Sequence, residues 1–210
     1  MYERFFYRSF ILFLGLFLLA FAVVLSIHSD LGTAPISSIP YTFSYFIPLS
    51  VGTLTVLLHG LFIILQMILL KNEFQWIQWS QILVGLVFGI IIDTMLWFTT
   101  DWQISSYPFQ IILSLISCIL TAVGVCFMFK AQLFYLAGEG LYQACAHRFK
   151  LDVGTCKTIG DCVLVTIAII TSFLVLNKLV GVREGTILMA LLVGTLVRVL
   201  KPYFSFLDYK

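Results

Sequence analysis

The tripeptide Val-Gly-Thr occurs twice in this chain, at residues 51–53 and at residues 153–155. Each copy begins a long apolar run, and the offset of 102 residues is about half of the chain. Further matching positions follow at an offset of 105 residues: Gly89 with Gly194, and Asp93 with Arg198. The difference between the two offsets indicates a three-residue insertion in the second copy. A long internal repeat constrains the fold strongly, because it predicts that the chain is built from two similar halves.

The composition indicates that the solvent around this chain is lipid. Hydrophobic residues make up 61% of the sequence and charged residues only 10%, against about 45–50% and about 25% in soluble domains. About 20 consecutive apolar residues cross a bilayer. Six segments satisfy this length: 9–27, 51–70, 81–98, 109–129, 153–176 and 185–203. We therefore expect an all-α membrane protein with six transmembrane helices.

The repeat assigns three predicted spans to each half, residues 1–105 and residues 106–210. Three is an odd number, so the second half must enter the membrane from the side opposite to the first. The predicted fold is therefore a single integral membrane domain made of two inverted three-helix repeats. Inverted repeats are common in secondary transporters, whose substrate sites lie near the bilayer midplane at the repeat interface. The alternative is that the duplication only assembles a stable helix bundle.

The distribution of basic residues predicts the orientation. One side of the predicted membrane carries eight lysines and arginines: Arg4, Arg8, Lys71, Lys130, Arg148, Lys150, Lys201 and Lys210. The other side carries only Lys178 and Arg183. Cytoplasmic loops are enriched in basic residues, so we expect both termini in the cytoplasm.

The connector between the first two spans, residues 30–49, is too apolar for a solvated loop. It contains three prolines, and a proline inside a helix removes a hydrogen bond and clashes one turn back. One long helix is therefore excluded. A short helix over residues 36–46, capped by Thr33 or Ser37, fits the pattern.

The corresponding segment of the second half is residues 137–147, where Glu139 matches Ser37 in the alignment of the halves. Two such helices could be re-entrant, since irregular backbone is tolerated at membrane depth where it lines a cavity. They could equally be amphipathic helices that lie flat at the interface.

Four short motifs resemble the YczE/YyaS/YitT family of bacterial integral membrane proteins. They are Gly32-Thr-Ala-Pro35, Leu49-Ser-Val-Gly-Thr53, the Gly89 to Asp93 end of the third span, and Gly185-Thr-Ile-Leu188. The resemblance covers roughly residues 10–200. It implies a small multi-spanning inner-membrane protein of a family often regarded as transporters. Arg198 departs from the family pattern, in which an acidic residue closes the last span, so a shared ion-coupling scheme does not follow.

Ionisable groups inside a span are costly, and they usually face a cavity or a partner. The predicted spans contain five: His59, Asp93, Lys157, Asp161 and Arg198. The repeat alignment places Asp93 opposite Arg198, close to the midplane. This pair is predicted to form a gate or a clamp for a substrate carboxylate. The alternatives are a structural ion pair and an arginine that snorkels towards the cytoplasm.

The alignment also places His59 opposite Asp161. Histidine has an unperturbed pKa close to neutral, so these two residues are a hypothesis for proton coupling. The alternative for His59 is a structural hydrogen bond. Lys157 and Asp161 are four residues apart and therefore share a helix face, where a pair in the first turns of the helix would suffice to explain them.

Several functions are disfavoured by missing motifs. The sequence has no Gly-rich nucleotide loop of the Walker type and no His-Glu-x-x-His zinc motif. We expect neither an enzyme nor a cofactor or metal site. Gly85 and Gly89 have the small-xxx-small spacing that allows close helix packing, which would also serve an interface in a homodimer. No nucleic-acid partner is expected, and the lipid bilayer is the predicted surrounding.

The function that fits best is secondary transport of a small anionic or zwitterionic metabolite by alternating access. The residues predicted to bind substrate or ion are Ser37, Ser38, His59, Asp93, Glu139, Lys157, Asp161 and Arg198. Three alternatives remain: a substrate-binding subunit of a larger importer, a channel, and a membrane scaffold or regulator without transport activity.

Overall fold

The computed structural model describes residues 2–207, and side chains from residue 5 to residue 204. This part of the chain is helical and contains no strand. Eight α-helices follow one another: α1 (Tyr2–Ser29), α2 (Pro35–Phe43), α3 (Val51–Leu70), α4 (Ser80–Phe98), α5 (Tyr107–Ala131), α6 (Ala137–Phe149), α7 (Val153–Leu176) and α8 (Glu184–Leu200). Three 3-10 helices accompany them: η1 (Lys71–Glu73), η2 (Trp76–Trp79) and η3 (Lys201–Leu207).

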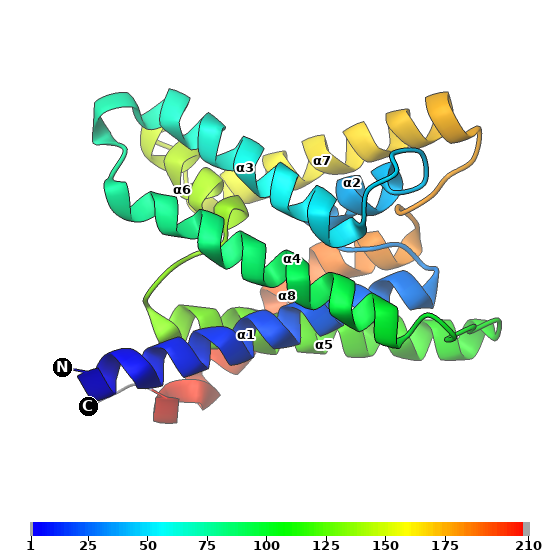
Figure 1. Ribbon diagram of the computed structural model, residues 1–210, viewed down its shortest axis with the longest axis horizontal. Coiled ribbons are helices and arrows are strands. Elements are labelled where there is room, and N and C mark those ends of the chain that lie inside the picture. The colour runs from blue at the N-terminus through cyan, green and yellow to red at the C-terminus, as the bar shows by residue number, and fades with distance from the viewer. Residues whose placement is uncertain (1, 208–210) are drawn as a thin grey trace.

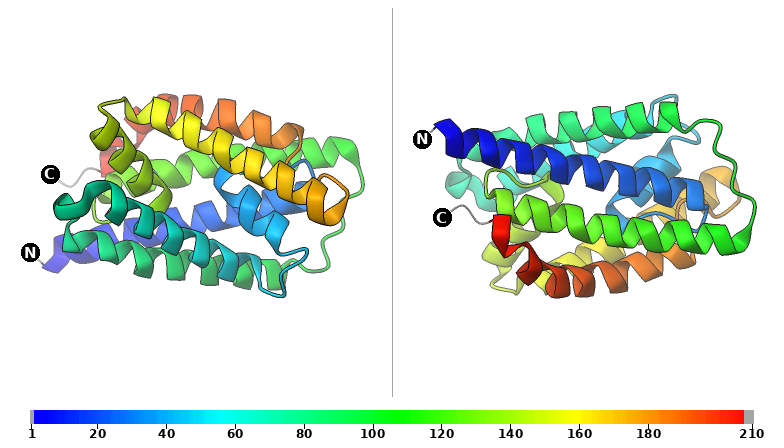
Figure 2. Two further views of the ribbon diagram at one scale, coloured as in Figure 1. Left: turned by 90° about the horizontal axis from the view of Figure 1, so that it is seen from above. Right: turned by 90° about the horizontal axis from the view of Figure 1, so that it is seen from below.

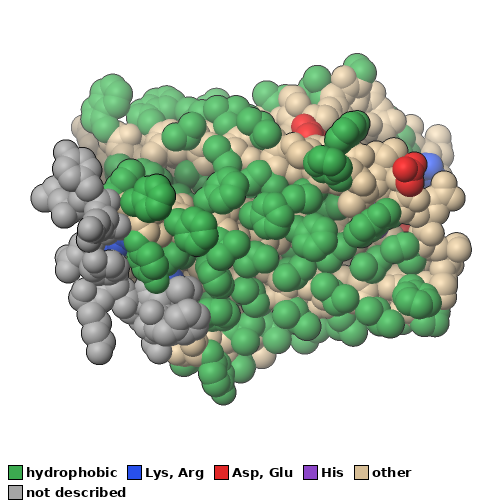
Figure 3. Space-filling model, turned by 60° about the horizontal axis from the view of Figure 1, so that its bottom comes forward, with side chains coloured by type: hydrophobic (Ala, Val, Ile, Leu, Met, Phe, Trp, Pro, Cys, Tyr) green, Lys and Arg blue, Asp and Glu red, His purple; other side chains and the backbone are tan. Residues whose placement is uncertain are grey.

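Six of the helical segments are long and apolar enough to cross a membrane, by length and composition. They are Phe5–Ser29, Val51–Glu73, Trp76–Phe98, Tyr107–Ala131, Val153–Leu176 and Glu184–Phe204. The prediction of an all-α chain with six such segments is confirmed, and each predicted segment lies within an observed one. Apolar side chains cover most of the face in Figure 3, and the few charged ones lie away from its centre.

Helices α1 and α5 pack along each other over a long distance, at the base of the bundle in Figure 1. Their closest approach is at Gly15 and Gly124, where a Cβ on either residue would lie 3.0–3.1 Å from the carbonyl oxygen of the other. Helix α4 packs on α1, and α8 packs on α5.

The two short helices pack on long helices of the opposite half. Helix α2 lies on α7, and α6 lies on α3, at opposite ends of the bundle (Figures 1 and 2). Helix α3 also packs along α4, whereas α7 and α8 barely touch. The start of α1 and the segment η3 lie at the same end of the bundle (Figure 2).

The repeated Val-Gly-Thr tripeptide is the first turn of α3 and of α7. Ser50 precedes the first copy, and its hydroxyl accepts a hydrogen bond from the Thr53 N–H at 3.1 Å. Asp152 precedes the second copy and accepts from the N–H groups of Gly154 and Thr155 at 2.8 and 2.9 Å. Each side chain thus satisfies N–H groups that have no partner inside the helix.

The predicted cap of the first short helix is wrong. Helix α2 begins at Pro35, preceded by Ala34, and no side chain caps it. Proline suits this position because its fixed φ angle is helical and it has no N–H to satisfy. The Thr33 hydroxyl instead donates to the carbonyl of Gly181, 3.3 Å away.

The count of basic residues includes two that the structure does not fully describe. The side chain of Arg4 and the whole of Lys210 lie outside the described part of the chain.

Candidate functional site

An ionisable cluster lies where α6 meets α7. The Tyr142 hydroxyl donates to Oδ1 of Asp161 at 2.6 Å, and the Lys157 ammonium donates to Oδ2 at 2.7 Å. The same ammonium lies 5.3 Å from the centre of the Tyr142 ring. Asp161 is only 9% exposed. Both carboxylate oxygens therefore have a donor, which is the condition under which a buried charge is tolerated.

Gly160 allows α6 to approach α7 closely enough to form this cluster. A Cβ at residue 160 would overlap the edge of the Tyr142 ring. Position 160 precedes Asp161 directly, so the absent side chain admits the tyrosine whose hydroxyl reaches the neighbouring carboxylate.

Glu139 belongs to the same cluster but is not satisfied. It lies in the first turn of α6, one turn before Tyr142, and its Oε2 atom is buried without a hydrogen-bond partner. Burial raises the pKa of the Glu139 carboxyl, and the nearby positive charge of Lys157 opposes this effect. A buried carboxyl oxygen without a donor is costly when ionised, so the site favours the protonated form more than water does.

The first turns of α2 and α6 meet close to this cluster. A Cβ at Gly138 would lie 2.9 Å from the Cδ1 atom of Ile36, so the contact depends on a glycine. Ser37 and Ser38 are buried in the first turn of α2. The Ser38 hydroxyl donates to the carbonyl of Pro35 at 2.7 Å, so it serves the local backbone.

His59 lies elsewhere, against α4. Its ring stacks between Phe62 and Phe88, with centroid distances of 6.3 and 6.0 Å, and it is 2% exposed. Its Nδ1 atom is buried without a partner and faces Gly85. The predicted meeting of His59 with Asp161 is therefore absent from the structure, because His59 faces α4 while Asp161 faces α6.

Asp93 and Arg198 do not meet either, so the predicted pair is wrong for this structure. Asp93 accepts hydrogen bonds from the Gly52 N–H at 2.7 Å and from the Ser50 hydroxyl at 2.6 Å. It therefore caps the start of α3. Arg198 lies in the last turn of α8, exposed, and forms none of the ion pairs found among the described side chains.

Comparison with known proteins places the whole helical bundle in one family. The model of a family of unknown function, DUF6198, matches residues 6–202. This chain belongs to DUF6198. No curated protein and no solved structure gives a significant match. The resemblance to the YczE/YyaS/YitT family stays a prediction.

In this DUF6198 chain, sequence reasoning missed a pair of buried amides. Gln66 of α3 and Gln81 of α4 hydrogen-bond each other reciprocally, at 2.9 and 3.2 Å. The Gln66 amide also donates to the carbonyl of Ala137, at the start of α6, at 3.1 Å. Both glutamines lie inside predicted spans, and a neutral amide there is a signal of the same kind as an ionisable group, because it too needs a hydrogen-bond partner. Tyr142 gave no such signal, since tyrosines are frequent in this chain.

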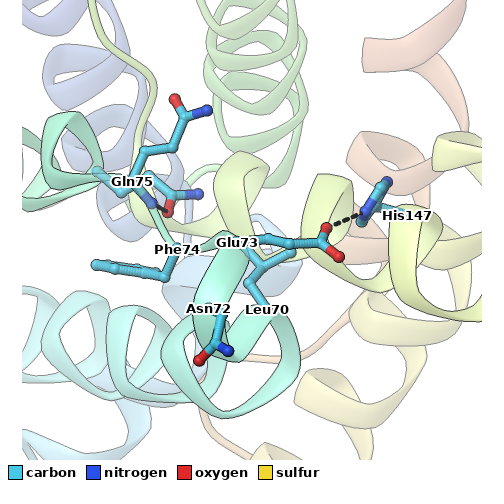
Figure 4. A pocket seen from close by; sticks show the side chains of 7 residues that line it. Leu70, Asn72, Glu73, Phe74, Gln75 and His147 are labelled. Carbon is cyan, nitrogen blue, oxygen red and sulfur yellow. Dashed lines mark hydrogen bonds and ion pairs between the residues drawn. The ribbon is translucent and has the colours of Figure 1, made fainter.

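A cavity of about 560 Å³ opens beside the connection between α3 and α4 (Figure 4). Across it, Nε2 of His147 lies 2.5 Å from the Glu73 carboxylate, and this contact joins the end of α6 to η1. Both side chains are about two-thirds exposed, at 65% and 68%. Exposed ion pairs contribute about 0–1 kcal/mol, so the pair is a weak link between these segments of the DUF6198 fold. Among the described residues, no group of three or more His, Cys, Asp or Glu side chains is placed to hold a metal ion.

Proposed function

We propose that this DUF6198 protein is a secondary transporter built from two inverted repeats, α1–α4 and α5–α8. The supporting observation is the exchange of short helices, because α2 packs on α7 while α6 packs on α3. A two-fold axis in the membrane plane would relate these two contacts. The same axis would relate α1 to α5, which pack on each other. Such repeats place a substrate site at their interface.

The short helices are proposed to be re-entrant. Helix α2 has 9 residues and α6 has 13, which gives lengths of about 14 and 20 Å at about 1.5 Å per residue. Neither length spans a hydrocarbon core of about 30 Å. Their first turns meet at Ile36 and Gly138, and this favours two half-helices that enter from opposite faces over two helices that lie flat.

The proposed site for substrate and coupling ion is the cluster of Glu139, Tyr142, Lys157 and Asp161. Lys157 forms its ion pair with Asp161, and its positive charge also acts to lower the pKa of Glu139. A proton that binds Glu139 removes one of the two negative charges near this lysine. In the proposed cycle, Lys157 changes its partner when Glu139 is protonated and when substrate binds.

The cluster narrows the proposed substrate class. It offers two carboxyl groups and one ammonium, and Arg198 does not reach it. A substrate that carries both an amine and a carboxylate would find a partner for each charge. Of the anionic and zwitterionic metabolites that the sequence suggests, the zwitterion is therefore favoured. The termini are proposed to face the cytoplasm, as the basic residues indicate, and the bacterial inner membrane is proposed from the resemblance to the YczE/YyaS/YitT family.

Transport by purified protein in liposomes tests this proposal. A mixture of amino acids and other small zwitterions is supplied with and without an inward proton gradient, and uptake is measured by mass spectrometry. The wild type is expected to accumulate at least one compound when the gradient is present. Glu139→Gln and Asp161→Asn are expected to lose the dependence on the gradient.

Asp101→Asn is the matched control, because Asp101 is an exposed acid in the connection between α4 and α5. It should transport like the wild type. The proposed coupling would be wrong if all three variants kept the same dependence on the gradient. The transport proposal itself would fail if the wild type moved no member of the mixture.

A further inference from the structure

A second cavity lies at the end of the bundle opposite to η3, and both halves of the chain contribute to it. It has a volume of about 210 Å³. The first half supplies residues from the end of α1 to the end of α2, and the second half supplies residues of the loop between α7 and α8. Ligand pockets for drug-sized molecules measure about 300–1,000 Å³, so an occupant of this cavity must be smaller.

The loop that forms one wall is held in place by hydrogen bonds to its backbone. The Thr33 N–H donates to the carbonyl of Gly181 at 3.0 Å, and the Thr42 hydroxyl donates to the carbonyl of Val180 at 3.0 Å. The Ser172 hydroxyl donates to the carbonyl of Lys178 at 2.6 Å and accepts from the Val180 N–H at 2.8 Å. The wall is therefore fixed by side chains of α7 and of the opposite half.

Two glycines bring the walls together. Gly32 and Gly181 both have positive φ angles, 94° and 78°, which residues with a Cβ rarely adopt. A Cβ at Gly181 would lie 2.6 Å from the Thr42 hydroxyl oxygen, and one at Gly32 would overlap the Thr186 hydroxyl. Larger residues at these positions would push the loops apart and open the cavity.

Three charged residues line the cavity, namely Asp30, Lys178 and Arg183, and Glu184 forms an ion pair with Arg183 at 3.2 Å. Arg183 is already engaged, since it donates to the Asp30 carbonyl at 2.6 Å and lies 3.6 Å from the Asp30 carboxylate. Lys178 differs. Its ammonium lies 5.5 Å from the centre of the Tyr45 ring, and no described carboxylate lies within ion-pair distance of it.

Two tyrosine hydroxyls complete the lining. Those of Tyr41 and Tyr45 are 2.8 Å apart, so one donates to the other and the second proton remains for a ligand. Burial and this hydrogen bond raise the pKa of Tyr41 far above its usual value. Tyr41 therefore stays a neutral hydroxyl that can donate.

The position of these cations within the predicted topology is unusual. Lys178 and Arg183 are the two basic residues on the side of the membrane that should carry few. The ion pairs with Asp30 and Glu184 account for Arg183, and a role in binding accounts for Lys178. We propose that this cavity binds a small anion with a carboxylate or phosphate group, held by the Lys178 ammonium and a Tyr41 or Tyr45 hydroxyl. This site is separate from the cluster at Asp161 and does not require that the chain transports anything.

Direct binding to the purified full-length protein tests the proposal. Inorganic phosphate and succinate are titrated at constant ionic strength, with isothermal titration calorimetry as the readout. At least one of them should bind saturably to the wild type. Lys178→Gln is expected to weaken binding about tenfold, which corresponds to about 1.4 kcal/mol. Tyr41→Phe, which keeps the ring, is expected to weaken it by a smaller factor.

Lys201→Gln is the matched control, because the Lys201 ammonium lies 5.5 Å from the centre of the Phe129 ring at the other end of the bundle. It removes the same charge and the same kind of contact, so it should leave the affinity unchanged. Equal weakening by Lys178→Gln and Lys201→Gln would overturn the proposal.

The headgroup of an anionic lipid offers the same chemistry as a free anion, and a second measurement distinguishes the two sources. The protein is extracted from membranes that contain phosphatidylglycerol, and the retained lipid is quantified. If the headgroup is the occupant, the wild type and Lys201→Gln retain the lipid, Lys178→Gln loses it, and added phosphate displaces it. The proposal is overturned if neither soluble anion binds and lipid retention is the same in all variants.

Discussion

The sequence alignment of the two halves matches the helix pair α3–α4 with the pair α7–α8, but the two pairs pack very differently. Gly52 of α3 and Gly89 of α4 are in such close contact that a Cβ on Gly52 would overlap the Gly89 carbonyl oxygen. The equivalent residues of the second half are Gly154 and Gly194. Gly194 has no atom within 4 Å of the position of a Cβ, and the three atoms nearest to that position at Gly154 all belong to Asp152, two residues before it.

The reason for this difference lies one turn further along. Asp93 accepts hydrogen bonds from the first turn of α3 and thereby ties α4 to it. Arg198 holds the equivalent position in α8, but a guanidinium group has no acceptor. It is also repelled by the partial positive charge at a helix N-terminus. The N–H groups of α7 are taken by Asp152 instead. Glycines thus permit two helices to pack closely. In the pair that does pack closely, α3 and α4, a complementary polar contact accompanies the glycines.

The largest expected effect is an opposite change in stability when each of two equivalent glycines is replaced by alanine. Gly89→Ala should destabilise the protein by about 1–3 kcal/mol through overpacking, because the new methyl would lie 2.6 Å from Val56 and 2.7 Å from the Gly52 carbonyl oxygen. Gly194→Ala meets open space and should stabilise by up to about 1 kcal/mol, since alanine is the better helix former. Unfolding by sodium dodecyl sulfate in mixed micelles measures both. Equal destabilisation by the two variants would show that α7 and α8 pack as α3 and α4 do.

A smaller difference in stability is expected between substitutions of the two polar residues, Asp93 and Arg198. Asp93→Asn should cost about 1–2 kcal/mol, because it removes charge from the hydrogen bonds that cap α3. Arg198→Gln should stay within about 0.5 kcal/mol, as for other exposed positions. The same unfolding measurement compares them. If Arg198→Gln proved as costly as Asp93→Asn, the arginine would have a partner that this arrangement does not provide.

The smallest expected effect is a change in how the stability depends on pH, and it concerns the caps of α3 and α7. Hydrogen bonds from Thr155 and Gly154 hold the pKa of Asp152 below its usual value of 3.8. A carboxyl with a lowered pKa in the folded state adds stability above its unfolded pKa, and this stability is lost as the pH falls through the folded value. Asp152→Ser, which copies the Ser50 cap of α3, should therefore flatten the loss of stability in acid.

The measurement is the free energy of unfolding between about pH 2 and pH 5, because the lowered pKa of Asp152 lies below its usual value of 3.8. It is best made in the Glu139→Gln background. The raised pKa of Glu139 acts with the opposite sign, because its stability contribution is lost as the pH rises. An unchanged acid slope in Asp152→Ser would mean that the cap does not titrate with folding.

The helical class, the six long apolar segments and the short helices that follow the first and fourth of them could all be predicted from the sequence. These follow from local quantities, namely the length of the apolar runs and the prolines at 35, 40 and 48. The search for charges inside apolar segments also selected Lys157 and Asp161, which form an ion pair in the structure, and the alignment of the halves selected Glu139 opposite Ser37.

The contacts between side chains could not be predicted, because they depend on how each helix is rotated against its neighbours. Successive residues of a helix point about 100° apart, so a small rotation of a helix moves a side chain from one neighbour to another. His59 therefore faces α4 rather than Asp161, and Asp93 serves α3 rather than Arg198. Residues that match in the alignment of the halves have contacts that depend on the chemistry of every neighbour. Here an aspartate at one position accompanies a closely packed pair of helices, and an arginine at the matching position accompanies an open pair.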